Sequence, residues 1–362
     1  MVVQPDRIEA GGLGGQAGVA HGRPVGALDP ERRAESHRRY RTGVTLPDAP
    51  AGAIAPALRE AILAWFDAAG RPLAFRGTAD PWAILVSEAM AQQTQAARAA
   101  EAWSRFLGEF PTVEALASAT PAAVLRAWRG LGYNRRALAL RRAAIVIVGE
   151  HGGRVPADLD ALRRLPGVGP YTARAVAALA FAQRVGAVDT NVRRVLNRAV
   201  GGRPGTFTEA ELQAVADASV PGDRPGHWTH ALMDVGATFC RPRAPRCDPC
   251  PARAFCRAAI NGTADMPARG GGARRRDGAA RAGAAAIGAR ERGAPFHATS
   301  RWLRGRILDE LRDAPADAWA RVDAPLGDHD AVAVETAVRG LVREGLVELH
   351  PTDRGLARLP LA

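Results

Sequence analysis

The chain has 362 residues, of which 47% are hydrophobic and 24% are charged. Its 49 basic residues, all arginine, outnumber 37 acidic ones, so the formal net charge is +12. This balance indicates a polyanionic partner, most simply nucleic acid. The absence of lysine excludes a lysine Schiff base. We find no apolar run of about 18 residues and no apolar signal-peptide core in MVVQPDRIEAGGLGGQ, so we expect a soluble, cytoplasmic protein without a membrane segment.

Composition and periodicity divide residues 1–297 into three segments. Residues 1–48 are rich in Gly, Arg and Pro without periodicity, and we expect them to be disordered. Residues 49–262 show successive helical periodicities, including one stretch over 81–110, and predict an all-α domain. Residues 263–297 are basic and of low complexity, which predicts a flexible linker.

The C-terminal segment, residues 298–362, is periodic again. It contains two amphipathic stretches, RWLRGRILDELRDA and DAVAVETAVRGLVREGL, followed by VELHPTDRGLARL. The first two predict helices and the third predicts a short hairpin. Helices followed by a hairpin are typical of a small winged-helix-like module.

A glycine turn lies within LRRLPGVGPYTARAVAALA, residues 162–180. Gly167 permits a positive φ between two helices, and the backbone N–H groups of Gly167, Val168 and Gly169 lie at the positive end of the second helix, where they can bind a phosphate. This pattern predicts a helix-hairpin-helix DNA-binding motif. The alternative is an ordinary helix–helix turn with glycine caps.

Two carboxylic residues are candidates for acid–base chemistry. Asp189 follows the second hairpin helix, in GAVDTNVRRVLNR, so a strand bound by the hairpin would pass close to it; the alternative is a helix N-cap. Glu88, in PWAILVSEAMAQQTQ, shares a partly apolar helical face with Gln92, which favours a raised pKa and a general-acid role. The alternative is a rim glutamate. Gln92 and Gln93 belong to a polar run suited to reading base edges or filling a base stack, or to a solvated surface.

All four cysteines lie within 17 residues, in the spacing C-x6-C-x2-C-x5-C: Cys240, Cys247, Cys250 and Cys256. Clustered cysteines in a cytosolic protein are more often metal ligands than disulfides. The set predicts an iron–sulfur cluster, with structural zinc as the alternative. No redox-partner motif accompanies it, so we expect the metal to order the loop. Arginines inside the loop are candidates for contact with DNA phosphates.

Taken together and in this order, SEAMAQQTQA, GLGYNRRALAL, LPGVGPYTARAV, VDTNVRRVLNR and the cysteine spacing resemble the MutY-type adenine DNA glycosylases of the helix-hairpin-helix, iron–sulfur superfamily. The resemblance covers about residues 55–260. It implies an all-α glycosylase core, a [4Fe–4S] cluster and double-stranded DNA with mismatched or oxidised base pairs as the partner. It implies no nucleotide cofactor, and we expect a monomer acting on the bacterial nucleoid.

The same resemblance implies residue roles in base excision repair. Glu88 would protonate the adenine opposite 8-oxoguanine or guanine, and Asp189 would stabilise the sugar cation, with Tyr171 and Asn191 in the catalytic group. This agrees with the two carboxyl groups that glycosidic cleavage needs and with base flipping. Gln93 and Tyr133 would wedge into the duplex. Arg76, in RPLAFR, would lie near the base pocket.

A lysine occupies the position of Tyr171 in relatives that also cut the backbone, so we expect a monofunctional enzyme without lysine-dependent lyase activity. The chain departs from the family pattern at LAFR, which replaces the usual LPWR, and at His230, where relatives often carry Glu or Gln. We expect residues 298–362 to be too few for the Nudix-like domain that reads 8-oxoguanine in many relatives. The alternatives are a thymine or uracil mismatch glycosylase and a non-enzymatic iron–sulfur DNA-binding regulator.

Overall fold

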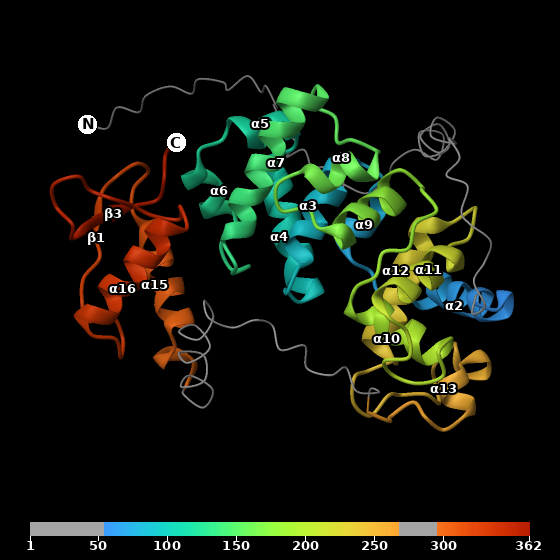
Figure 1. Ribbon diagram of the computed structural model, residues 1–362. Helices are drawn as coiled ribbons and strands as arrows, with labels where there is room; N and C mark the ends of the chain where they lie inside the picture. The colour runs from blue at the N-terminus through green and yellow to red at the C-terminus, as the bar shows by residue number, and fades with distance from the viewer. Residues whose placement is uncertain (1–53, 268–294) are drawn as a thin grey trace, which may run out of the picture.

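The computed structural model describes residues 54–267 and 295–362, and Figure 1 shows their arrangement. The elements preceding the cysteine loop are α2 (Pro56–Ala69), η1 (Ala74–Gly77), α3 (Pro81–Ala91), α4 (Ala96–Glu109), α5 (Val113–Ser118), α6 (Pro121–Ala127), α7 (Arg135–His151), α8 (Leu159–Arg164), α9 (Pro170–Ala180), α10 (Thr190–Ala199), α11 (Glu209–Ser219) and α12 (Pro225–Thr238). The remaining elements are η2 (Arg253–Phe255), α13 (Arg257–Ile260), η3 (Phe296–Ala298), α15 (Ser300–Asp313), β1 (Ala320–Arg321), α16 (Ala331–Arg343), β2 (Glu348–Leu349) and β3 (Leu356–Arg358).

The helices before the linker pack into two lobes, each with its own hydrophobic core. The first lobe contains α3 to α9 and buries large side chains such as Phe106 and Trp128. The second contains α2 and α10 to α13 and is built around side chains such as Trp228. The chain crosses between the lobes after α9, over residues 181–189. Side chains from α3, α9 and the start of α10 therefore meet where the lobes join.

The all-α core is confirmed, but one expected helix is divided. The stretch 81–110 forms α3 and α4 with a break at residues 92–95, where Gln92 is the C-cap of α3 and Gln93 has a φ of +53°. Gln92 therefore lies just outside the helix rather than on its continuing face. No described helix is long and apolar enough to cross a membrane.

The C-terminal module has the two helices and the hairpin expected from the sequence, together with a strand that was not predicted. Strand β1 pairs antiparallel with β3, which also pairs antiparallel with β2, so the sheet order is β1-β3-β2. Helices α15 and α16 pack on one another, and their apolar side chains belong to the same core as the first lobe. Figure 1 shows α15 beside α6.

The segment boundaries differ slightly from those expected. Residues 1–48 and most of 263–297 lie outside the described residues. At the near end of the expected linker, the Thr263 hydroxyl donates to the carbonyl of Gly202 and the Asp265 carboxylate accepts from the N–H of Ala244, so residues 263–267 belong to the helical domain. At the far end, Phe296–Ala298 forms η3 against α15, so the module begins before residue 298.

Candidate DNA-binding and catalytic site

Three polar side chains meet at the junction of the lobes, each from a different helix. Glu88 lies in α3, Tyr171 in the first turn of α9, and Asp189 at the N-cap of α10. Each of the two carboxylates acts on the pKa of the Tyr171 hydroxyl, which places all three groups within electrostatic reach of one another. The structure thus brings together the two candidate acids, which are 101 positions apart in the sequence.

Glu88 is buried, with 7% of its surface exposed. Burial raises its pKa from 4.5 to about 7, since a carboxylate loses hydration there; a hydrogen bond with Tyr171 lowers the pKa, and the charge of Asp189 raises it further. A carboxyl group with a pKa near 7 is substantially protonated at neutral pH. Glu88 is therefore suited to donate a proton, and the rim-glutamate alternative is wrong.

Tyr171 is the polar neighbour of Glu88 in α9. Burial and the two nearby carboxylates keep the pKa of its hydroxyl well above 10. The hydroxyl also approaches the Met233 sulfur, at 3.9 Å. Tyr171 therefore stays protonated and acts here as a hydrogen-bond donor, not as a nucleophile.

Asp189 caps α10 and is held through both of its carboxylate oxygens. Oδ1 accepts from the N–H of Val192 at 2.6 Å, and Oδ2 accepts from the Asn191 side-chain amide at 2.9 Å. The N-cap interpretation is thus correct, and it is compatible with a catalytic role because these bonds orient a half-buried carboxylate at the junction. Asn191 is placed beside Asp189 as a positioning residue.

Arg194 connects this carboxylate to the cysteine loop. Its Nη2 donates at 2.7 Å to Oδ1 of Asn191 and at 2.7 Å to the carbonyl of Gly236, and its Nε donates to the carbonyl of Cys240. Gly236 is required for this approach because a Cβ there would lie 2.5 Å from the Cβ of Asn191. Neither residue was identified from the sequence, since the contacts join α10 to α12 and carry no local signal.

The hairpin adopts the predicted turn between α8 and α9. Gly167 has a φ of +81°, and a Cβ there would lie 2.8 Å from the Cβ of Ala139 in α7, so glycine is required for both turn and packing. The Val168 N–H donates to the Leu165 carbonyl at 3.1 Å and is not free for a ligand. Among the described residues, the N–H groups of Gly167 and Gly169 have no partner, and the space beside Gly169 is open. These two N–H groups remain candidates for phosphate contact.

The two expected wedge residues occupy neighbouring turns. Gln93 and Tyr133 both have left-handed backbones, with φ of +53° and +45°, and both are exposed. Tyr133 is 48% exposed despite its large ring. The amide of Gln92 instead turns inward and donates to the Thr172 hydroxyl at 3.3 Å. The structure therefore presents Gln93 and Tyr133 outward and assigns Gln92 to the contact between α3 and α9.

Arg136, which the sequence did not single out, joins these two turns. Its Nη1 donates to the carbonyls of Ala89 at 2.8 Å and Gln92 at 2.6 Å, at the end of α3. Its Nη2 lies 3.2 Å from the carbonyls of both Leu131 and Gly132 in the other turn. The Arg136 guanidinium thus donates hydrogen bonds both to the carbonyls that end α3, the helix of Glu88, and to the carbonyls of the turn that contains Tyr133.

A cavity of about 450 Å³ lies beside α3 and α12. Its wall includes Arg76, as expected, together with Phe66, Ser87 and His230. Burial and the charge of Arg76 lower the pKa of His230 to about 3, so this histidine is neutral. The volume falls in the range of small-molecule pockets, roughly 300–1,000 Å³. Glu88 does not line this cavity; it follows Ser87 on α3 and faces Tyr171.

Arg76 is fixed at this cavity by an ion-pair network. Its two terminal nitrogens donate to both oxygens of the fully buried Asp234, at 2.7 and 2.6 Å, and Arg71 binds the same carboxylate. The two arginines hold the pKa of Asp234 below its usual value despite burial. A lone acidic residue in the apolar stretch HALMDVGATF indicates that Asp234 needs a buried partner, but it does not identify Arg71 or Arg76 as that partner.

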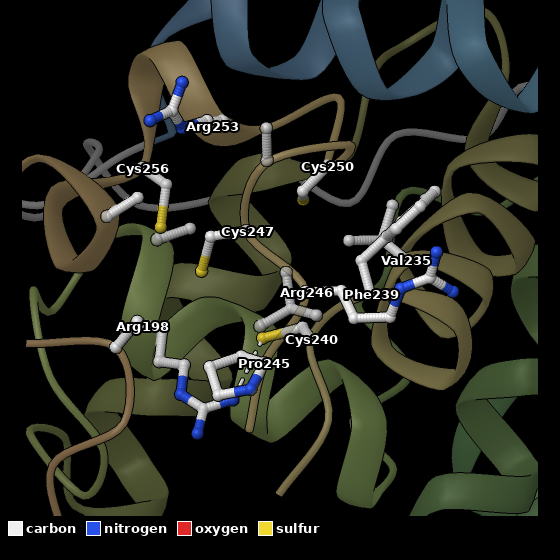
Figure 2. A pocket seen from close by; sticks show the side chains of 15 residues that line it. Arg198, Val235, Phe239, Cys240, Pro245, Arg246, Cys247, Cys250, Arg253 and Cys256 are labelled. Carbon is white, nitrogen blue, oxygen red and sulfur yellow. Dashed lines mark hydrogen bonds between the residues drawn. The ribbon is translucent and has the colours of Figure 1, made fainter. Parts of the chain in front are cut away.

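The four cysteines line one pocket between α10, α12 and the loop that follows (Figure 2). Arg198 borders it and donates to the Cys240 sulfur at 3.4 Å. Burial raises the pKa of the Cys250 thiol to about 12. Within the described residues, no three Cys, His, Asp or Glu side chains converge on a site for one metal ion. Four thiols around one pocket are a donor set for either an iron–sulfur cluster or a structural zinc ion.

Comparison with known proteins agrees with this geometry. Residues 86–216 match the family described as HhH-GPD superfamily base excision DNA repair protein. The chain is 41% identical over 290 residues to a protein of Mycolicibacterium smegmatis named adenine DNA glycosylase, covering 79% of this chain and 91% of that one. It is 32% identical over 198 residues to the thymine/uracil-DNA glycosylase of Methanothermobacter thermautotrophicus, covering 54% of this chain and 90% of that one.

A solved structure titled as a thermostable thymine-DNA glycosylase superposes with a TM-score of 0.52 at 31% identity, covering 56% of this chain and 95% of that chain. Identity is higher and coverage of this chain greater for the adenine enzyme than for the thymine/uracil enzyme. The chain belongs to the adenine DNA glycosylases of the HhH-GPD superfamily.

Proposed function

We propose that this protein is a monofunctional glycosylase of base excision repair that removes adenine mispaired with 8-oxoguanine or guanine. The observation that carries the proposal is the pairing of a buried Glu88, whose pKa is about 7, with an oriented Asp189 carboxylate at the same junction. Glu88 is suited to stay protonated at neutral pH, and hydrogen bonds from Val192 and Asn191 orient the Asp189 carboxylate beside it. This arrangement fits an acid and a charge-stabilising partner.

The proposed reaction breaks the bond between the sugar C1′ and the adenine nitrogen. Glu88 gives its proton to a ring nitrogen of the base, and the bonding electrons leave with the neutral adenine. Asp189 stabilises the positive charge that develops at C1′. A water molecule then adds to C1′ and loses a proton, which leaves free adenine and an abasic site in an unbroken strand.

We expect no strand cleavage because of Tyr171, which lies in the first turn of α9. Tyr171 occupies the position where a nucleophilic amine would be needed, and its hydroxyl stays protonated. The chain contains no lysine. No side-chain amine is therefore available to form a Schiff base with the abasic sugar.

We propose that the protein engages double-stranded DNA, as a monomer, across the face that joins the hairpin to the two exposed turns. The free N–H groups of Gly167 and Gly169 bind a phosphate, while Gln93 and Tyr133 enter the stack as the adenine flips out. The cavity beside Arg76 supplies a base-sized space next to α3.

We propose that the four cysteines hold a [4Fe–4S] cluster. The ligands are Cys240, Cys247, Cys250 and Cys256. Held by these four side chains, which lie against the second lobe, a cluster would tie the loop to that lobe. Arg198 and Arg194 contact Cys240 and so link the loop to the helix that Asp189 caps.

A thymine or uracil mismatch glycosylase is the second candidate, because one relative carries that name. The buried, readily protonated Glu88 favours adenine, since departure of a purine is promoted by protonation of a ring nitrogen. The regulator hypothesis gives neither carboxyl group a role.

The experiment uses duplexes with one central pair: A opposite 8-oxoguanine, G or C, and T or U opposite G. We expect alkali-dependent cleavage at A opposite 8-oxoguanine or G, and intact strands without alkali. Cleavage at T or U alone would favour the second candidate. Strand breaks without alkali or heat would contradict monofunctionality, and an E88Q/D189N variant as active as the wild type would contradict the enzyme.

A further inference from the structure

The C-terminal module is packed onto the glycosylase core rather than tethered beside it. The buried Arg312 donates to the Leu125 carbonyl at 2.9 Å and to Oδ1 of Asn134 at 2.7 Å. The Ala122 N–H donates to the Pro360 carbonyl at 2.8 Å. These polar contacts accompany a shared apolar core, so the orientation of α15 relative to the 131–134 turn is determined.

This packing brings α15 to the ring of Tyr133. The guanidinium of Arg301, in the first turn of α15, lies 5.1 Å from the ring centroid, and that of Arg136 lies 5.6 Å from it. The exposed tyrosine therefore has a cation from the core and a cation from the module beside it. Arg301 is itself exposed, so its charge faces solvent at the edge of the wedge turn.

The C-terminal module has few unpaired positive charges that could bind a polyanion. Residues 295–362 contain nine arginines and eleven acidic residues, whereas residues 54–267 contain 26 arginines and 18 acidic residues. Six of the module's arginines form ion pairs: Arg304, Arg306, Arg312, Arg321, Arg339 and Arg358. Among the described residues, Arg301, Arg343 and Arg354 have no acidic partner.

Helix α16, which lies between β1 and β2 in the chain, is poorly suited to DNA. It carries two arginines, and Arg339 is paired with Glu335. Its N-terminal end exposes Val332, at 71%, beside the capping carboxylate of Asp330. A helix with this surface offers little attraction to a phosphate backbone.

We propose that Arg301 binds the phosphate backbone of the duplex next to Tyr133, so that the module extends the DNA-binding face of the core through α15 and not through α16. The inference rests on the proposed function, because it places DNA at the Tyr133 turn. The ligand is a DNA phosphate, and the contact is independent of base sequence.

The test measures binding of full-length holo-protein to a duplex with a tetrahydrofuran abasic analogue opposite 8-oxoguanine, across a salt series. We expect R301Q to weaken binding about three- to tenfold at low salt and to reduce the salt slope by about 1, as for a lost phosphate contact. R301K should retain most of the slope. R343Q is the matched control and should leave affinity and slope unchanged.

The proposal is overturned if R301Q binds the duplex with the wild-type salt slope. This holds even if R301Q slows excision, because the substitution would then act only by disturbing the ring of Tyr133. It is also overturned if R343Q, and not R301Q, lowers the slope. Thermal unfolding of each variant checks the fold, which an exposed residue without an ion pair should leave intact. Failure of the proposed function is separate: the wild type would then bind the duplex but release no adenine from a mispaired substrate.

Discussion

The Nη1 atom of Arg136 lies 2.6 Å from the carbonyl oxygen of Gln92, the residue that ends the helix carrying Glu88. The same guanidinium also holds the turn before Tyr133. One side chain therefore couples the end of the Glu88 helix to both turns that we propose face the DNA. Arg136 thereby connects the turn that contains Gln93 to the turn that contains Tyr133.

Replacing Arg136 with glutamine should destabilise the fold and slow excision. The carbonyls at the end of α3 would lose a charged donor, and each such hydrogen bond contributes roughly 1.5–3 kcal/mol. Thermal unfolding and single-turnover excision measure the two effects. The neighbouring R135Q is the control for the fold, because Arg135 is exposed. Equal stability of R136Q and R135Q would contradict the bridging role.

The excision rate should fall as the pH rises through about 7, the pKa of Glu88, because only the protonated acid can donate. The E88Q variant should lose about 10²–10⁴-fold in rate if Glu88 acts as the general acid. Single-turnover rates from pH 5 to 9 provide the measurement. A wild-type rate that is flat over this interval, with E88Q equally active, would remove the acid role.

Stability should depend on pH in the same direction. The pKa of Glu88 is higher in the folded protein than in the unfolded chain, so the folded state binds the extra proton between about 4.5 and about 7. Folding therefore becomes less favourable as the pH rises through this window. E88Q should remove that dependence and unfold at a higher denaturant concentration than the wild type at pH 8. If E88Q instead unfolded at a lower denaturant concentration than the wild type, burial of the ionised Glu88 carboxylate would not destabilise the folded protein.

The two roles of Asp189 can be separated by substitution. D189N retains a good N-cap, so the free energy of unfolding should change little, whereas D189A should cost about 1 kcal/mol. Both variants should lose excision because neither provides a negative charge at the sugar. Urea unfolding and excision assays on the same preparations supply the comparison. An active D189N would mean that Asp189 serves only as the cap.

Replacing Cys250 with serine should remove the absorbance of the bound cluster and lower the melting temperature. The thiol belongs to the pocket that packs against the second lobe. Excision should also fall, because Arg194 connects the Cys240 carbonyl to Asn191 and Asp189. Iron content, visible absorbance and melting curves test this. A C250S protein with full iron content would remove Cys250 from the ligand set.

Periodicity and turn residues were sufficient to predict the helices, the hairpin, the cap at Asp189 and the cysteine loop, because each depends on neighbours in the sequence. The break between α3 and α4 was missed because AQQTQAAR contains neither glycine nor proline. At this break, Arg136 of α7 donates hydrogen bonds to the backbone carbonyls at the end of α3, so the helix can end there without a glycine or proline. Strand β1 was missed because two residues are too few for an alternating pattern, and its pairing with β3 is long-range.

In the candidate site, too, residues within local motifs could be predicted from the sequence, whereas long-range contacts could not. Motifs identified Glu88, Tyr171 and Asp189. The partners of the buried Asp234, Arg76 and Arg71, lie 158 and 163 positions away from it and could not be identified from local sequence. The contact of Arg301 with Tyr133 likewise joins the C-terminal module to the core. Such contacts are determined by how the lobes and the module pack.

In the proposed function, Glu88 and Asp189 together release adenine. The most direct measurement is chromatography of the free base released in a single turnover from a duplex with A opposite 8-oxoguanine, for the wild type, E88Q and D189N. We expect free adenine from the wild type, and release slower by at least about 10²-fold for both E88Q and D189N. Release of no base by the wild type with its cluster intact, or release by both variants at the wild-type rate, would contradict it.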